Sequence, residues 1–168
     1  MGGAVMPQCV RFHRSSIRMA TPADMAALIP LVNAAFAVET FIDGTRTDQE
    51  RMAALMEKGV FLVCERDGRA AACVYAELRG ERGYFGMLAV DPGLQELGLG
   101  RSMAAAAEQY CRERGCKHMD LTVLSLRPEL PPLYRKLGYA ETGTEQFHPP
   151  RPLKNGAECH CIVMSKVL

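Results

Sequence analysis

The sequence predicts a single α/β domain built on a mixed β-sheet. Its 168 residues match the usual size of one compact domain. A content of 48% hydrophobic and 23% charged residues is ordinary for a soluble globular protein. Segments with helical spacing of apolar residues alternate with runs rich in β-formers. At this length folding buries roughly 68–70% of the surface of the unfolded chain, so the core needs neither disulfides nor a metal ion.

Residues 1–16 are predicted to form a flexible leader, and residues 17–168 the folded domain. The leader mixes Gly, Pro, Arg and Ser without periodicity. The chain shows neither a charged-then-apolar export signal nor an apolar run of 18 residues, so we expect no membrane association and a cytoplasmic location. Seven cysteines form an odd set with no CxxC spacing, which predicts free thiols and no metal site.

The first half of the domain is predicted to contain two helices followed by a hairpin. Thr21 supplies an N-cap hydroxyl and Pro22 the first helical position. Asp67-Gly68 is the strongest hairpin signal in the chain. The elements expected here are a strand at 17–20, helices at 21–36 and 47–58, and strands at 60–64 and 70–78.

The second half is predicted to alternate strands with helices. Asp91-Pro92-Gly93 ends one strand, and Gly115 ends the long helix that follows it. The elements expected here are a strand at 84–90, helices at 100–114 and 132–137, and strands at 118–124, from 139 onwards and at 158–166.

The segment 88–101 carries the first chemical signal. A strand leads into a tight loop, in which Gly98 and Gly100 are one residue apart, and the loop opens a helix. Unpaired N–H groups at the positive end of a helix dipole bind phosphate or diphosphate well. The spacing fits neither the P-loop nor the dinucleotide-binding fingerprint, because Arg101-Ser102 follows Gly100 and position 103 is Met. On this evidence alone, the glycines either admit an anion or merely shape the turn.

Two motifs give the sequence a specific resemblance. Gln95-Glu96-Leu97-Gly98-Leu99-Gly100 resembles the Q/R-x-x-G-x-G/A signature of the GNAT superfamily of N-acetyltransferases. Leu133-Tyr134-Arg135-Lys136-Leu137-Gly138-Tyr139 is similar to the "YEKLGF" helix end of the same family. The resemblance covers residues 17–168. It implies the GNAT fold, a central mixed, mostly antiparallel sheet with two splayed parallel strands, flanked by helices.

The resemblance also implies acetyl-CoA as the acyl donor, bound where the two parallel strands part. The strand at 84–90 would carry a bulge and bind the pantetheine arm through its backbone, with the Leu88 amide near the thioester carbonyl. A donor aimed at a developing oxyanion typically contributes about 10²–10³ in rate. The expected cofactor-binding residues are Leu88, Ala89, Val90, Gln95, Glu96, Leu97, Gly98, Leu99, Gly100, Arg101 and Ser102.

Tyr134 aligns with the tyrosine that protonates the leaving thiolate in many members of this family. A phenol with a reference pKa of about 10 stays protonated at neutral pH and can donate to a thiolate. The alternative is that the Tyr134 ring simply packs in the core. For the general base, the nearest carboxylate by topology is Glu77. It either accepts the proton of the amine, directly or through water, or is a solvated charge at the edge of the sheet with no part in the reaction.

The resemblance implies an amine acceptor, and the Pro-rich stretch after Arg127 favours a small molecule over a peptide. Arg127 stands where many members carry Asn, and it either contacts CoA or caps a loop. Weak candidates for contact with the acceptor are Phe41, Asp43 and Tyr84, and either Glu39 or Asp43 could meet an ammonium group.

The mode of action and the oligomeric state stay open. The resemblance implies direct attack of the amine on the thioester in a ternary complex, and the alternatives are a covalent acyl-cysteine enzyme and a non-catalytic acyl-CoA sensor. Charges of 20 against 19 give a net +1, which predicts no nucleic-acid partner. The protein would act as a monomer or a homodimer.

Overall fold

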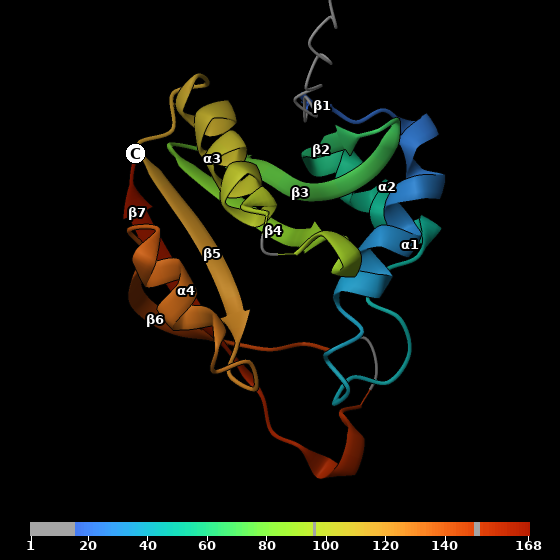
Figure 1. Ribbon diagram of the computed structural model, residues 1–168. Helices are drawn as coiled ribbons and strands as arrows, with labels where there is room; N and C mark the ends of the chain where they lie inside the picture. The colour runs from blue at the N-terminus through green and yellow to red at the C-terminus, as the bar shows by residue number, and fades with distance from the viewer. Residues whose placement is uncertain (1–15, 96, 150–151) are drawn as a thin grey trace, which may run out of the picture.

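A seven-stranded sheet forms the centre of the molecule (Figure 1). The computed structural model describes residues 16–95, 97–149 and 152–168. The strands lie in the order β1-β2-β3-β4-β5-β7-β6, and only β4 and β5 run parallel. The mixed, mostly antiparallel sheet is therefore confirmed. The strands are β1 Ser16–Met19, β2 Val60–Arg66, β3 Arg69–Arg79, β4 Arg82–Val90, β5 His118–Leu124, β6 Ala140–Gln146 and β7 His160–Val167.

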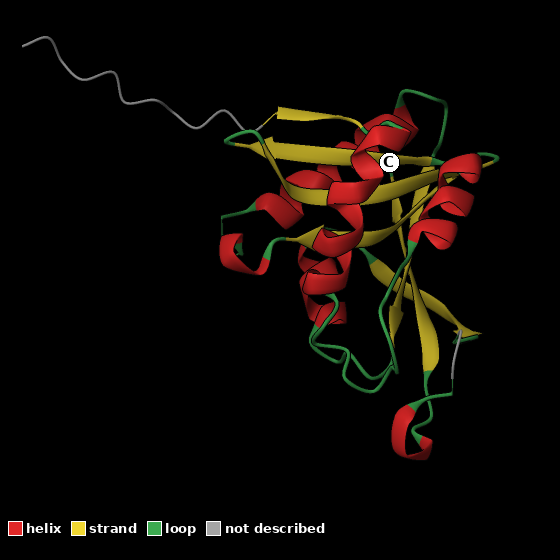
Figure 2. Cartoon of the chain, turned by 90° about the vertical axis from the view of Figure 1, so that its right-hand side faces the viewer, coloured by secondary structure: helices red, strands yellow, loops and turns green. Residues whose placement is uncertain are grey.

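Helices cover both faces of the sheet (Figure 2). On one face, α1 and α2 bury Leu28, Val32 and Met52 against β2 and β3. On the other face, the apolar side of α3 packs through Met103 and Ala107, as its spacing predicted. The helices are α1 Met25–Ala35, α2 Gln49–Lys58, α3 Leu99–Arg112 and α4 Leu130–Lys136, with short 3₁₀ turns η1 Pro22–Asp24, η2 Pro92–Leu94 and η3 Lys154–Gly156.

Most element boundaries differ from the predictions by one or two residues, and two differences change an assignment. The first predicted helix is divided, because a 3₁₀ turn precedes α1 and Thr21 N donates to Asp24 Oδ2 at 2.7 Å. Ser16, expected in the leader, belongs to β1 and pairs with Glu65. The rest of the predicted leader lies outside the described residues. None of the described helices is both long enough and apolar enough to cross a membrane.

The parallel strands β4 and β5 part soon after they begin. Their pairing runs only from Arg82↔His118 to Tyr84↔Asp120, although both strands continue beyond that point. The splayed pair that the resemblance implied is thus present. Beyond Tyr84, no strand among the described residues pairs with the edge of β4 that faces β5.

A β-bulge in β4 lies within the splayed part. Cys73 pairs with Ala89 and Tyr75 with Gly86, so Met87 and Leu88 both lie opposite one residue of β3. Met87 adopts a φ of 46°, which an L-residue with a long side chain rarely does. A bulge bends its strand and redirects side chains, and this one lies beyond Tyr84, where β4 is no longer paired with β5. The bulge expected in this strand is confirmed.

Candidate active site

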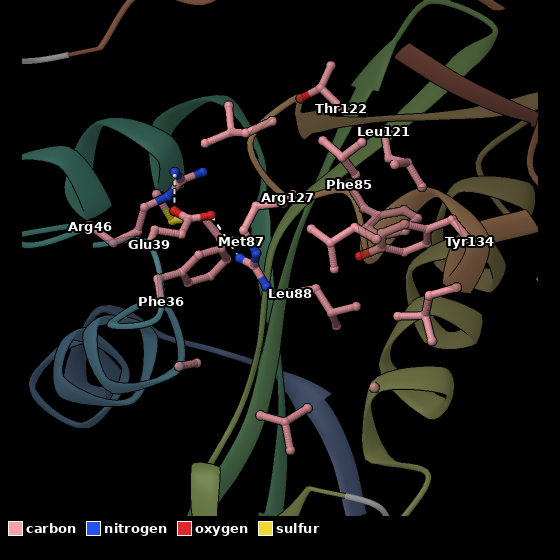
Figure 3. A pocket seen from close by; sticks show the side chains of 18 of the residues that line it. Phe36, Glu39, Arg46, Phe85, Met87, Leu88, Leu121, Thr122, Arg127 and Tyr134 are labelled. Atoms are coloured by element: carbon pink, nitrogen blue, oxygen red, sulfur yellow. Dashed lines mark hydrogen bonds and ion pairs between the residues drawn. The ribbon is translucent and has the colours of Figure 1, made fainter. Parts of the chain in front are cut away.

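A cavity of about 410 Å³ occupies the gap between β4 and β5 (Figure 3). Its walls come from five parts of the chain: strand β4, strand β5, the start of α3, helix α4, and the α1–α2 connection. The lining is mostly apolar, with a few polar groups at its ends, which is typical of a small-molecule site.

The start of α3 forms one end of the cavity. Gly98 has a φ of 75°, so its glycine is required by backbone conformation. Ser102 N donates to Gly98 O at 3.1 Å in the first turn. The N–H groups of the three residues between them are the orphan donors of a helix start, at the positive end of its dipole.

Gly100 lies in helical backbone, so its conformation does not require glycine. A Cβ built on Gly100 would meet Val90 Cγ2 at 3.8 Å, an ordinary van der Waals contact. The fold therefore tolerates a methyl group here. What glycine leaves open is the approach of a ligand to the backbone of the first turn.

Tyr134 lies in the wall formed by α4, with 8% of its surface exposed. Its ring belongs to an aromatic cluster with Phe85, at 6.0 Å between centroids, and Tyr139, at 6.2 Å. Burial raises the pKa of Tyr134 to about 12, and the positive charge of Arg127 partly opposes this shift. The hydroxyl makes no hydrogen bond to another residue among those described, so it stays available as a proton donor.

The opposite side of the cavity holds a charged cluster of Glu39, Arg46 and Arg127 (Figure 3). Glu39 is buried, with 6% of its surface exposed. Its Oε1 accepts from Arg46 Nη1 at 3.2 Å, and its Oε2 from Arg127 Nη1 at 2.9 Å. Both carboxylate oxygens are thus partnered, as a buried charge requires.

The α1–α2 connection that carries Glu39 and Arg46 is fixed at two points. The amide of Asn33 bonds both backbone groups of Thr47, at 2.9 Å and 3.1 Å. Near its tip, Ile42 forms an isolated antiparallel bridge with Leu153, from the β6–β7 connection. This bridge joins two connections that are far apart in the sequence on the side of the cavity that holds the charged cluster.

Most of the predicted cofactor-binding residues meet at this cavity. Its lining includes Leu88, Val90, Gln95, Gly98, Leu99 and Gly100, together with Tyr84 and Tyr134. Arg101 and Ser102 lie in the first turn of α3 but outside the lining, and Leu97 is exposed. Ala89 is buried on the α1 face of the sheet. Glu96 lies outside the described residues.

The structure does not favour Glu77 as a base that contacts the acceptor. Glu77 is absent from the cavity wall, and its carboxylate accepts from Tyr75 Oη at 2.7 Å and from Arg79 Nε at 3.0 Å. Desolvation acts to raise the pKa of Glu77, but these hydrogen bonds outweigh it and hold the pKa below its ordinary value. A carboxyl group with a lowered pKa is a weaker base.

Two of the weak acceptor candidates, Phe41 and Asp43, also lie outside the cavity lining. Phe41 instead uses its carbonyl oxygen to accept from Lys154 N.

Arg46 lines the cavity but was not predicted from the sequence. From the sequence, an arginine in a polar loop is expected to be solvated. The signal that could have identified it is its pairing with Glu39, which is seven positions earlier and buried.

Comparisons with known proteins bear on the family and the fold of the chain. A sequence model described as the Acetyltransferase (GNAT) family matches residues 27–139. A curated mycothiol acetyltransferase from Cellulomonas flavigena is 29% identical over 118 residues, which are 64% of this chain. The matched stretch covers 33% of the length of that relative.

Solved structures show the same fold. The ribosomal-protein-S18-alanine N-acetyltransferase of Escherichia coli aligns with a TM-score of 0.74 and 19% identity, over 92% of this chain and 94% of that one. The protein yncA of Salmonella typhimurium, solved with its cofactor acetyl-CoA, aligns with a TM-score of 0.72 and 22% identity, over 92% of this chain and 94% of that one.

Proposed function

Because the chain belongs to the acetyltransferase (GNAT) family, we propose that it transfers the acetyl group of acetyl-CoA to a primary amine of a small molecule. The amine attacks the thioester carbonyl directly, so a C–N bond forms as the C–S bond breaks. The products are an N-acetylated amine and free CoA. Holding both reactants in one cavity can supply about 7–11 kcal/mol of the barrier.

The observation that carries the proposal is that one cavity joins the start of α3 to the hydroxyl of Tyr134. Acetyl-CoA supplies an activated thioester when bound. The orphan N–H groups of the first turn of α3 would hold its diphosphate, and Gly100 leaves that backbone accessible. The unpaired edge of β4, around Leu88, would bind the pantetheine arm.

Tyr134 acts as the general acid. Its raised pKa keeps the phenol protonated, and it donates this proton to the leaving sulfur. The proton that the attacking amine loses passes through water. Of the carboxylates among the described residues, only Glu39 lines the cavity, and its oxygens are held by two arginines. Glu77 enters only as a remote acceptor reached through water.

One observation favours the alternative of a non-catalytic acyl-CoA sensor: no unpaired carboxylate lines the cavity in the part of the chain that the structure describes. Release of the CoA thiol from acetyl-CoA, measured with a panel of amines, separates the two functions. The enzyme gives amine-dependent release, whereas the sensor binds CoA without it. An acyl-protein adduct trapped without acceptor would instead support a covalent cysteine route.

A further inference from the structure

The cavity wall carries more positive than negative charge at its acceptor side. Its charged residues, among those described, are Glu39, Arg46 and Arg127. Arg127 has a second partner, Glu129, whose side chain is 57% exposed and lies outside the lining. Within the described part of the chain, the only carboxylate that pairs with Arg46 is that of Glu39, which it shares with Arg127. The charge of Arg46 is therefore only partly balanced.

Arg46 is held in place with donors to spare. Its guanidinium lies over the Phe36 ring, 4.7 Å from the centroid, and uses Nη1 to bond Glu39. Its Nε and Nη2 make no hydrogen bond to another residue among those described. The neighbouring Thr47 is fixed by Asn33, so the backbone that carries Arg46 is fixed as well. A planar guanidinium with free N–H groups matches a carboxylate well.

The same cluster disfavours a simple cationic acceptor. An ammonium group that approached Glu39 would meet two guanidinium groups that already occupy its oxygens. Like charges within a few ångströms repel each other strongly where water is scarce. An acceptor with its own negative group avoids this repulsion and binds the spare donors of Arg46.

We propose that the acceptor is an amine that also carries a carboxylate, as an amino acid does, and that Arg46 selects it by binding that carboxylate. The proposal rests on the acetyl transfer proposed above and names its substrate class. The cavity of about 410 Å³ must also take the thioester arm, which favours a small anion such as a carboxylate. Arg127 has a different role. Its charge acts on Tyr134, and its hydrogen bond to Glu39 orients the carboxylate that holds Arg46.

The test compares amines that differ only in the carboxylate, namely leucine with isoamylamine and phenylalanine with phenethylamine. We expect kcat/KM for release of the CoA thiol to be about 10- to 100-fold higher for the amino acid of each pair, the effect of a hydrogen bond to a charged group. Arg46→Gln should remove this preference through KM, and Arg46→Lys should keep part of it. Arg51→Gln is the matched control. Arg51 lies on α2 and forms an exposed ion pair with Asp48, so this variant should keep the full preference for the amino acid.

Equal efficiency for both members of each pair, or an equal loss for both in Arg46→Gln, would overturn the carboxylate proposal while leaving acetyl transfer intact. If no amine releases CoA, acetyl transfer fails instead. Calorimetry with CoA-saturated protein then still tests the carboxylate site. Heat from the amino acids that Arg46→Gln abolishes supports the site, and no heat from either amino acid refutes it.

Discussion

Arg82 and Asp120 form a two-point ion pair where β4 and β5 are last joined. Arg82 Nε donates to Asp120 Oδ2 at 2.7 Å, and Nη2 donates to Oδ1 at 2.6 Å. Ser165 Oγ, from β7, donates to the same carboxylate. Three strands are thus tied together directly beside the point at which the cavity opens.

The pair predicts a pH dependence of stability. The hydrogen bonds from Arg82, acting against desolvation, hold the pKa of Asp120 below its ordinary 3.8. A lowered pKa contributes stability that is fully present above 3.8 and lost as the pH falls through the folded-state value. Asp120→Asn should lower the free energy of unfolding at neutral pH, because it removes the charge that pairs with Arg82. The expected loss is only about 0.5–1 kcal/mol, since solvent screens the exposed Arg82 side chain.

Urea unfolding measured from neutral pH to about pH 3 checks this expectation. The curves of wild type and Asp120→Asn should converge as the pH falls. Glu81→Gln, in an exposed pair with Lys117, serves as the control and should track wild type. Curves that stay parallel down to the lowest pH would mean that Asp120 does not act through its charge.

Tyr134→Phe should lower kcat by about 10²-fold with little change in the Kd for acetyl-CoA, because the change removes only the donated proton. With its pKa raised to about 12, Tyr134 should cause no loss of activity in wild type up to about pH 10. Tyr110→Phe, on α3 with its ring beneath Arg114, is the matched control. An unchanged kcat for Tyr134→Phe would remove this residue from the mechanism.

Gly100→Ala should separate folding from binding. Alanine is favoured over glycine in a helix by about 0.5–1 kcal/mol, and the added Cβ meets only Val90, at 3.8 Å, so the melting temperature should not fall. The methyl group would obstruct the approach of a diphosphate, and we expect the Kd for acetyl-CoA to rise about 10-fold, as when one hydrogen bond to a charged group is lost. Gly143→Ala, on β6 with open space around its Cβ, should leave the Kd unchanged. Calorimetric titration decides, and undiminished affinity in Gly100→Ala would place the diphosphate elsewhere.

Asn33→Ala should loosen the connection that carries Arg46. The change removes both hydrogen bonds between Asn33 and Thr47. Thr45 Oγ1 still donates to the Thr47 carbonyl at 3.2 Å, but the Thr47 N–H loses Asn33 Oδ1 as its acceptor, which costs about 1–3 kcal/mol of stability. KM for the acceptor should rise while the Kd for acetyl-CoA stays constant, because the α3 end of the cavity is untouched. Gln109→Ala, which removes an exposed amide bonded to Glu113 on α3, offers an amide control outside the cavity lining. A rise in the acetyl-CoA Kd of Asn33→Ala would show that the two ends of the cavity are not independent.

Gly98 and Gly100, before and within the first turn of α3, show which features can be predicted from neighbouring residues alone. The pair at Gly98 and Gly100 predicted a strand, a turn and a helix start, and all three are present. That prediction succeeds because capping, turn geometry and helix periodicity depend on neighbours within a few residues. The structure added a distinction between the two positions: Gly98 is required by its φ of 75°, whereas Gly100 is free to be any small residue as far as folding is concerned.

The sequence by itself determined the family, the order of the strands and helices, and the identity of the loop and tyrosine on which the proposed chemistry depends. Tertiary structure alone decided that Glu39 lies in the cavity between Arg46 and Arg127 and that Glu77 lies outside it. Arg127 is 88 positions from Glu39, and the two side chains meet in the wall of the cavity that lies where β4 and β5 part. A charge pair over such a distance leaves no local pattern, because its energy depends on burial and geometry that the whole fold creates.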